Sequence, residues 1–192
     1  MKLIKGKIYI KIIFFGTALA GKTTSLQWLF DNIIPDKMKI TEEITSIKTS
    51  FGQTLLFDFV PIQLGPNIIL RMYTATGQDY YRSTRKMLFE EADGIFFIVD
   101  SQKKELIHNK EFVDEFRNYL NEIDGMKDAD VIVLFNKHDL KDVHTPKYLE
   151  DKLDLKKYPN FTSSATTGKN LKKAFLSMIE KVLKRLKEEG LT

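Results

Sequence analysis

The chain has 192 residues, 43% hydrophobic and 29% charged, which is typical of one globular domain and not of a disordered protein. The net charge of +4 is too small an excess to indicate a nucleic-acid-binding protein. Cysteine is absent, which excludes disulfides, cysteine zinc sites and prenyl or palmitoyl anchors. The longest uncharged stretch, residues 59–70, is too short to span a bilayer and no secretory signal is visible. We expect a single cytoplasmic domain over residues 1–192.

The first half of the chain predicts strands, one helix and a polar segment. Residues 35–52 are polar and irregular, so we expect a mobile segment there. Two later strands are expected to form an antiparallel pair joined across residues 61–66, which contain two prolines. The expected elements are a buried strand at Ile8–Phe15, a helix at Lys22–Asn32, and strands at Gln53–Val60 and Asn67–Tyr73.

The second half alternates apolar strands with amphipathic helices. A helix is expected to begin at Pro146, with Thr145 as its N-cap. The other expected elements are a helix late in 74–91, strands at Gly94–Asp100, Val131–Phe135 and Phe161–Ser163, and helices at Glu111–Ile123 and Leu171–Lys187. This order predicts a doubly wound α/β fold: a six-stranded, mostly parallel sheet with one antiparallel edge strand and helices on both faces.

A phosphate-binding loop lies between the first buried strand and the first helix. Gly16-Thr17-Ala18-Leu19-Ala20-Gly21-Lys22-Thr23 matches the P-loop pattern G-x-x-x-x-G-K-[ST] in full. Its glycines and the helix N-terminus favour phosphate oxygens, and Lys22 supplies a cation for the β- and γ-phosphates. The Thr23 hydroxyl is expected to ligate Mg²⁺, and Thr24 to donate to the α-phosphate. The sequence therefore predicts a nucleoside-triphosphate site.

A second motif, Asn136-Lys137-His138-Asp139, follows the strand that ends at Phe135. The Asp139 carboxylate can accept from two guanine N–H donors, which adenine lacks on that edge. We expect Asn136 to brace the P-loop and the Lys137 stem to cover one face of the base. The backbone of Ser164-Ala165-Thr166 is expected to reach the guanine carbonyl oxygen. The pair of motifs predicts guanine nucleotide, GDP or GTP, as the ligand.

The motif order resembles the Ras superfamily of small GTPases, and most of all the prokaryotic MglA-type GTPases, over nearly the whole chain. The residues that carry the resemblance are Leu19–Thr24, Thr54–Pro61, Tyr73–Gln78, Asp93–Ser101 and Ala165–Gly168. It implies a P-loop NTPase fold of the small G domain type that switches between GDP and GTP with Mg²⁺. It also implies regulatory protein partners, often with a roadblock fold.

The resemblance implies a hydrolytic mechanism on named residues. Gln78 orients the attacking water, Lys22 offsets phosphate charge and the Gly77 N–H holds the γ-phosphate. Thr54 joins Thr23 as a Mg²⁺ ligand only when GTP is bound.

Three departures from the family pattern bear on turnover. Thr74 replaces the aspartate of D-x-x-G, and Asp58 is either its substitute or a surface carboxylate. Gln53 stands where MglA-type proteins place an arginine, and Ala18 replaces a P-loop glycine. We therefore expect slow unaided hydrolysis, with a non-hydrolysing GTP-bound scaffold as the alternative. An ATP-dependent kinase or motor is disfavoured by Asp139.

Two groups of basic residues have a functional and a plainer interpretation. Arg82 and Arg85 follow Gln78 and are either internal arginine fingers or, as we prefer, exposed helix cations. The outer face of the last helix is basic and is either a peripheral membrane contact or, as we prefer, a solvated face. That face comprises Lys172, Lys173, Lys181, Lys184, Arg185 and Lys187.

Overall fold

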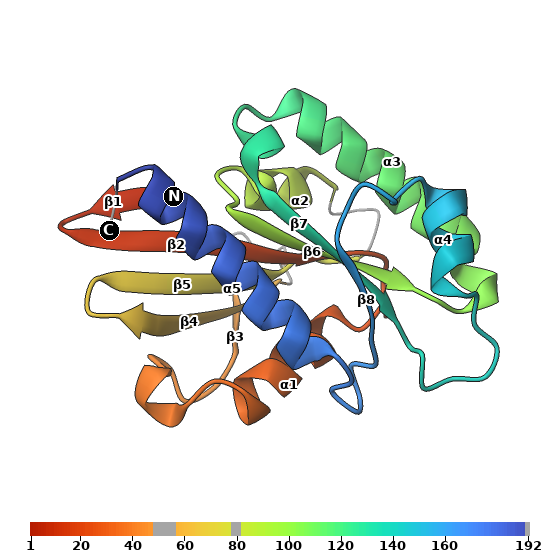
Figure 1. Cartoon of the computed structure of the whole chain (residues 1–192), viewed down its shortest axis with the longest axis horizontal. Coiled ribbons are helices and arrows are strands. Elements are labelled where there is room, and N and C mark those ends of the chain that lie inside the picture. Colours follow the sequence, from red (N-terminus) through yellow and green to blue (C-terminus); the bar gives the residue numbers. More distant parts are fainter. Residues whose placement is uncertain (48–56, 78–81, 191–192) are drawn as a thin grey trace.

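The computed structural model describes residues 1–47, 57–77 and 82–190. Its strands form one sheet in the order β3-β4-β5-β2-β6-β7-β8, with β1 paired to β2 off this path (Figure 1). The strands are β1 (Lys2–Ile4), β2 (Lys7–Phe15), β3 (Thr45–Ile47), β4 (Phe57–Gly65), β5 (Ile68–Thr74), β6 (Gly94–Asp100), β7 (Asp130–Asn136) and β8 (Asn160–Thr162). The helices are α1 (Lys22–Asn32), α2 (Arg82–Phe89), α3 (Leu106–Glu122), α4 (Pro146–Leu153) and α5 (Leu171–Glu188).

The parallel core of the sheet is as predicted. β2 pairs in parallel with β5 and β6, and β7 pairs in parallel with β6 and β8. Every residue of β6 is buried, because helices cover both faces of this strand. The predicted antiparallel pair is present, because β4 runs antiparallel to β5, but β3 and not β4 lies at that edge of the sheet. The short strands β1 and β3 bring the sheet to eight strands instead of six.

The predicted connection across residues 61–66 is wrong, because β4 continues through Pro61 to Gly65. Pro61 lies opposite Arg71 of β5, and its carbonyl accepts from the Ile40 N–H on the other side. The nitrogen of Pro61 therefore faces away from β5, where no ladder hydrogen bond is lost. The irregular segment predicted at 35–52 also contains β3, as far as the described residues extend.

Two hydrophobic layers flank the sheet. α1 and α5 cover one face, where Leu26, Phe30, Met178 and Val182 pack on β2 and β7. α2, α3 and α4 cover the other face (Figure 1). Aromatic rings fill much of this second layer, and the Phe116 ring stacks on Phe97 with centroids 5.3 Å apart. The central strands are therefore packed on both faces.

The predicted helix starts at Lys22, Pro146 and Leu171 agree with the structure, whereas α3 begins at Leu106 instead of Glu111. The Thr145 hydroxyl accepts from the Tyr148 N–H at 3.3 Å, so the predicted N-cap of α4 is confirmed. α5 buries Phe175, Met178 and Leu186 along one side.

The basic face assigned to α5 needs one correction. Arg185 is half-buried, because its guanidinium donates to the Asp93 carbonyl at 2.6 Å and lies 3.5 Å from the Asp130 carboxylate. The exposed cations of this helix include Lys172, Lys173, Lys184 and Lys187.

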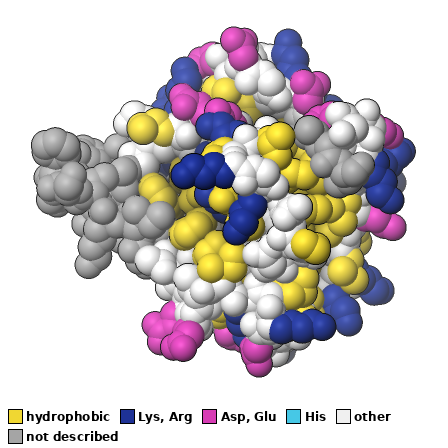
Figure 2. All heavy atoms as spheres, turned by 90° about the vertical axis from the view of Figure 1, so that its left-hand side faces the viewer, with side chains coloured by type: hydrophobic (Ala, Val, Ile, Leu, Met, Phe, Trp, Pro, Cys, Tyr) yellow, Lys and Arg dark blue, Asp and Glu magenta, His cyan; other side chains and the backbone are white. Residues whose placement is uncertain are grey.

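Figure 2 shows the end of the molecule where β1 and the start of β2 lie. Hydrophobic and basic side chains intermingle on this face. Leu3 and Ile4 of β1 are 63% and 42% exposed, between lysines 2 and 5. None of the helices in the described ranges combines the length and apolar character needed to cross a bilayer.

Candidate functional site

Those predicted site residues that the structure describes gather at the carboxyl ends of the parallel strands. The P-loop follows β2, Asn136 ends β7, and residues 163–166 follow β8. This edge of a doubly wound sheet is where such folds bind ligands.

The P-loop takes a conformation that needs two of its glycines. Gly16 has φ +149° and Gly21 has φ +100°, both unfavourable for other residues. A Cβ on Gly16 would clash with the Ile98 carbonyl, and one on Gly21 with the Asn136 amide. Gly21 also begins α1 without a side-chain cap. The first N–H groups of α1 therefore have no intrahelical or capping partner and favour an anion.

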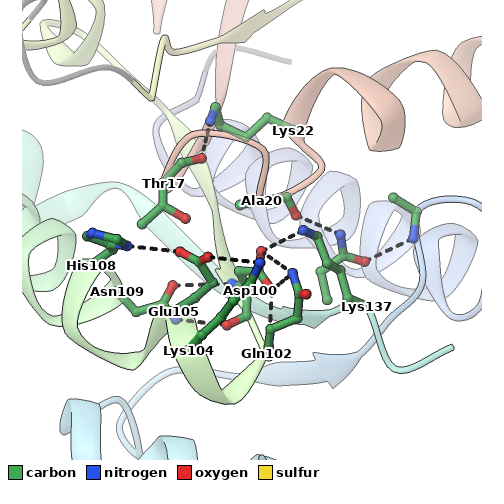
Figure 3. A network of polar contacts seen from close by, with 12 residues as sticks. Thr17, Ala20, Lys22, Asp100, Gln102, Lys104, Glu105, His108, Asn109 and Lys137 are labelled. Atoms are coloured by element: carbon green, nitrogen blue, oxygen red, sulfur yellow. Dashed lines mark hydrogen bonds and ion pairs between the residues drawn. The ribbon is translucent and has the colours of Figure 1, made fainter. Parts of the chain in front are cut away.

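Lys22 is buried beneath this loop. Its ammonium donates to the carbonyls of Gly16 at 2.9 Å and Thr17 at 2.5 Å (Figure 3). Burial, and then the charge of Arg85, lower the pKa of Lys22 to about 7. A phosphate next to this ammonium would stabilise its charged form. Thr23 and Thr24, in the first turn of α1, are exposed beside it, and Leu19 at the tip of the loop is 87% exposed.

Asn136 braces the P-loop as expected. Its amide donates to the Ala20 carbonyl at 2.7 Å, and its carbonyl oxygen accepts from the Ala165 N–H at 2.9 Å. The Ser163 hydroxyl lies 3.3 Å from the same oxygen. One buried carboxamide therefore joins the loops that follow three different strands.

Around Asn136 lie the other predicted base-binding groups. The exposed Asp139 carboxylate is 3.4 Å from the Thr166 hydroxyl, which in turn is 3.1 Å from the Ser164 hydroxyl. These contacts bring Asp139 to the loop at residues 164–166, as the base-site prediction requires.

Lys137 has a partner that sequence reasoning missed. Its ammonium lies 2.6 Å from the buried carboxylate of Asp100, the last residue of β6 (Figure 3). Asn109 of α3 exchanges hydrogen bonds with the Asp100 backbone and so fixes this strand end. The signal in the sequence was an acidic residue ending a wholly apolar strand.

Asp58 is no plain surface carboxylate. Its Oδ2 accepts from the Thr23 hydroxyl at 2.6 Å and from the Thr74 hydroxyl at 2.9 Å. Thr74 is the residue at the D-x-x-G aspartate position. A negative charge therefore lies beside the P-loop threonine, supplied from β4 instead of from the end of β5.

Gly77 lies directly against the P-loop, where a Cβ would clash with the backbone of Ala18.

The preferred interpretation of Arg85 as an exposed cation is wrong, since the side chain is 1% exposed and paired with Glu115. Because it is buried and paired, Arg85 is not placed to act as a mobile arginine finger either. Arg82, in contrast, is exposed at the start of α2. Thr54, Gln78 and Gln53 lie outside the described residues.

Comparisons with known proteins agree with this geometry. Residues 1–182 match the model of the "ADP-ribosylation factor family". The chain is also 28% identical over 189 residues to "Mutual gliding-motility protein MglA" of Myxococcus xanthus (strain DK1622), covering 96% of this chain and 95% of that protein. The predicted resemblance to small GTPases is thereby confirmed, and the chain belongs to the ADP-ribosylation factor family of small GTP-binding proteins.

Proposed function

We propose that this protein is a switch that binds GDP and GTP with Mg²⁺, hydrolyses GTP slowly, and acts through partner proteins that bind its GTP form. The observation that carries the proposal is the Asn136 carboxamide, which joins the P-loop to the loop at 163–166. This brace brings a phosphate-binding loop and the purine-recognising Asp139 into one site. We also propose that the protein is cytoplasmic and that its activator has a roadblock fold.

The phosphate end of the site suits a polyanion. Among the described residues, the Lys22 ammonium bonds to two carbonyl groups and to no carboxylate, and the N-terminus of α1 has no side-chain cap. Buried cations are costly unless an anion accompanies them. In the proposed complex, Lys22 holds the β- and γ-phosphate oxygens, and the Gly77 N–H lies next to the γ-phosphate.

The residues beside Thr23 fit a hard divalent cation. The Thr23 hydroxyl and the Asp58 carboxylate are oxygen donors of the kind Mg²⁺ prefers, and they already lie 2.6 Å apart. When bound, Mg²⁺ neutralises charge on the β- and γ-phosphate oxygens. We assign Asp58 as the acidic group that replaces the D-x-x-G aspartate, held in place by the Thr74 hydroxyl. Thr54 is the proposed additional ligand in the GTP form.

Slow turnover follows from the side chains around the γ-phosphate position. Gln78 is the proposed water-orienting group, but Gln53 supplies no cation where an arginine would. A non-hydrolysing scaffold is the second candidate. The contact of Gly77 with the Ala18 backbone favours it, because this contact leaves little room for a further group at that point.

The base preference is tested with Asp139→Asn. An amide in place of the carboxylate presents a donor to the guanine donors, so GDP affinity should fall about 100-fold or more. In the unaltered protein GTP should displace labelled GDP, whereas ATP should not. Asp142→Asn removes a nearby exposed carboxylate and is the matched control. Parental GDP binding by Asp139→Asn would contradict the assignment.

The metal assignment is tested with Asp58→Asn. Loss of the charge next to Thr23 should raise the Mg²⁺ concentration needed to retain GDP by about 10- to 100-fold. Nucleotide release followed across a Mg²⁺ titration measures this, with release in chelator unchanged. Asp31→Asn, an exposed change on α1, is the control. An unshifted Mg²⁺ requirement in Asp58→Asn would remove Asp58 from the metal site.

The buried Lys22 predicts a pH dependence of binding. With a pKa of about 7 in the free protein, Lys22 is charged below neutral pH and increasingly neutral above it. Phosphate raises that pKa, so binding takes up a proton above pH 7, and GDP affinity should weaken by about tenfold between pH 7 and 8.5. Calorimetry in buffers of different ionisation enthalpy measures the proton uptake. Guanosine, which lacks phosphates, should show no such dependence, and a pH-independent GDP affinity would refute the linkage.

Single-turnover hydrolysis separates the switch from the scaffold. The isolated chain should cleave GTP at a rate on the order of 10⁻⁴ to 10⁻³ s⁻¹, as expected without an arginine finger. Gln78→Leu should slow cleavage further. If cleavage is absent with and without source lysate, and Gln78→Leu changes nothing, the scaffold is supported. Fast cleavage by the isolated chain would contradict slow intrinsic turnover.

A further inference from the structure

A charged cluster lies buried between α2 and α3. Arg85 of α2 is 1% exposed and Glu115 of α3 is 7% exposed. The guanidinium makes two hydrogen bonds to the carboxylate, Nε to Oε1 at 2.6 Å and Nη2 to Oε2 at 2.7 Å. The same guanidinium lies over the Phe112 ring, 5.0 Å from its centroid. This geometry holds Arg85 in one orientation.

Tyr119, one turn after Glu115, completes the cluster. Its hydroxyl donates to Glu115 Oε1 and lies 3.0 Å from the Arg82 carbonyl at the start of α2. Burial, and then the hydrogen bond to Glu115, raise the pKa of Tyr119, so this group stays neutral. Burial alone would lower the pKa of Arg85, but the bonds to Glu115 outweigh it and raise that pKa. Arg85 therefore keeps its charge beside the Glu115 carboxylate, 2.6 Å away.

The third side of the guanidinium faces the predicted γ-phosphate region. Arg85 Nη1 donates to the Thr76 carbonyl at 3.3 Å. Thr76 is 8% exposed and directly precedes Gly77, which packs on the Ala18 backbone of the P-loop. A continuous line of contacts thus runs from α3, through Arg85 and Thr76, to the phosphate-binding loop.

Stability alone is a poor account of this cluster. A buried ion pair gains little over well-packed apolar side chains of similar volume, because both charges lose their hydration. The same two helices are already linked on their surface by Lys86 and Glu122, whose charged groups are 2.6 Å apart and about half exposed. What the buried pair adds is a donor at a fixed point, directed at the backbone next to Gly77.

We propose that Arg85, held by Glu115, is a positioning residue that fixes the Thr76–Gly77 backbone against the P-loop and so sets the preference of the protein for GTP over GDP. This inference rests on the proposed GTP-switch function. Removal of Arg85 takes this donor away from the Thr76 carbonyl, so that Gly77 is held less firmly at the γ-phosphate position. GDP, which has no γ-phosphate, is held by the P-loop and Asp139 without this contact.

The decisive variant is the double substitution Arg85→Met/Glu115→Leu. It replaces both charges with apolar groups, so no lone charge is left buried and the fold is retained. Lys86→Met/Glu122→Leu is the matched control, because it removes the surface pair between the same helices. The measurements are the melting temperature and the affinities for GDP and for a non-hydrolysable GTP analogue. Arg85→Lys is measured alongside, since a single ammonium cannot serve both Glu115 and Thr76 in the fork geometry.

The double variant should keep its GDP affinity within about twofold and lose about tenfold in GTP-analogue affinity, the effect of one hydrogen bond. Arg85→Lys should lose GTP-analogue affinity in the same direction, and it decides the matter if the double variant does not fold. The surface-pair control should match the parent in both affinities. An unchanged GTP-to-GDP ratio, or an equal loss for both nucleotides, overturns the positioning role while the proposed function stands. Failure of the parent to bind either nucleotide overturns both.

Discussion

The site depends on one carboxamide. Asn136, at the end of β7, donates to the P-loop at Ala20 and accepts from Ala165 in the loop after β8. Gly21 leaves the space that this amide occupies, because a Cβ there would clash with it. The glycine of one motif and the asparagine of the other are therefore a single structural requirement, although 115 positions of sequence separate them. Since the Asn136 carboxamide is buried, its loss leaves the Ala20 carbonyl and the Ala165 N–H without this partner and removes the link between the two loops.

The charges of the described residues near the P-loop suit a bound anion. Lys22 is surrounded by carbonyl groups and its pKa is lowered, which means that its charge is poorly compensated. A second buried cation, Arg85, is paired with the carboxylate of Glu115, and Lys137 is paired with that of Asp100. Asp58 is the acidic group bonded to Thr23 next to the phosphate loop. In the proposed complex, a triphosphate supplies the negative charge next to Lys22, and a divalent cation lies next to Thr23 and Asp58.

Local patterns predicted most of this, and long-range pairings did not. The apolar runs of β6 and β7 are each made of consecutive residues, and so are the two nucleotide motifs. Strands, loops and candidate site residues could therefore be predicted from them. Arg85 looked like a surface cation because its partner Glu115 lies 30 residues away, on a helix whose packing no local pattern reveals. Asp58 was undecided for the same reason, since Thr23 lies 35 residues away. The sequence predicts that the strand ends before Pro61, because proline lacks the N–H for a ladder hydrogen bond. The structure accommodates Pro61 within β4 because its nitrogen faces away from β5, which only the tertiary position of the strand reveals.

The central claim is that these loops form one guanine-nucleotide site, and the only tryptophan of the chain allows a direct measurement. Trp28 of α1 lies beneath Gly168 and lines a cavity of about 380 Å³ with Thr23 and Thr166. Its fluorescence should therefore change when a nucleotide joins the P-loop to the loop at 164–166. We expect GDP to change the emission with saturation at one equivalent, and ADP at a large excess to leave it unchanged. An equal response to ADP and GDP, or no binding of GDP by fluorescence and calorimetry alike, would contradict the account.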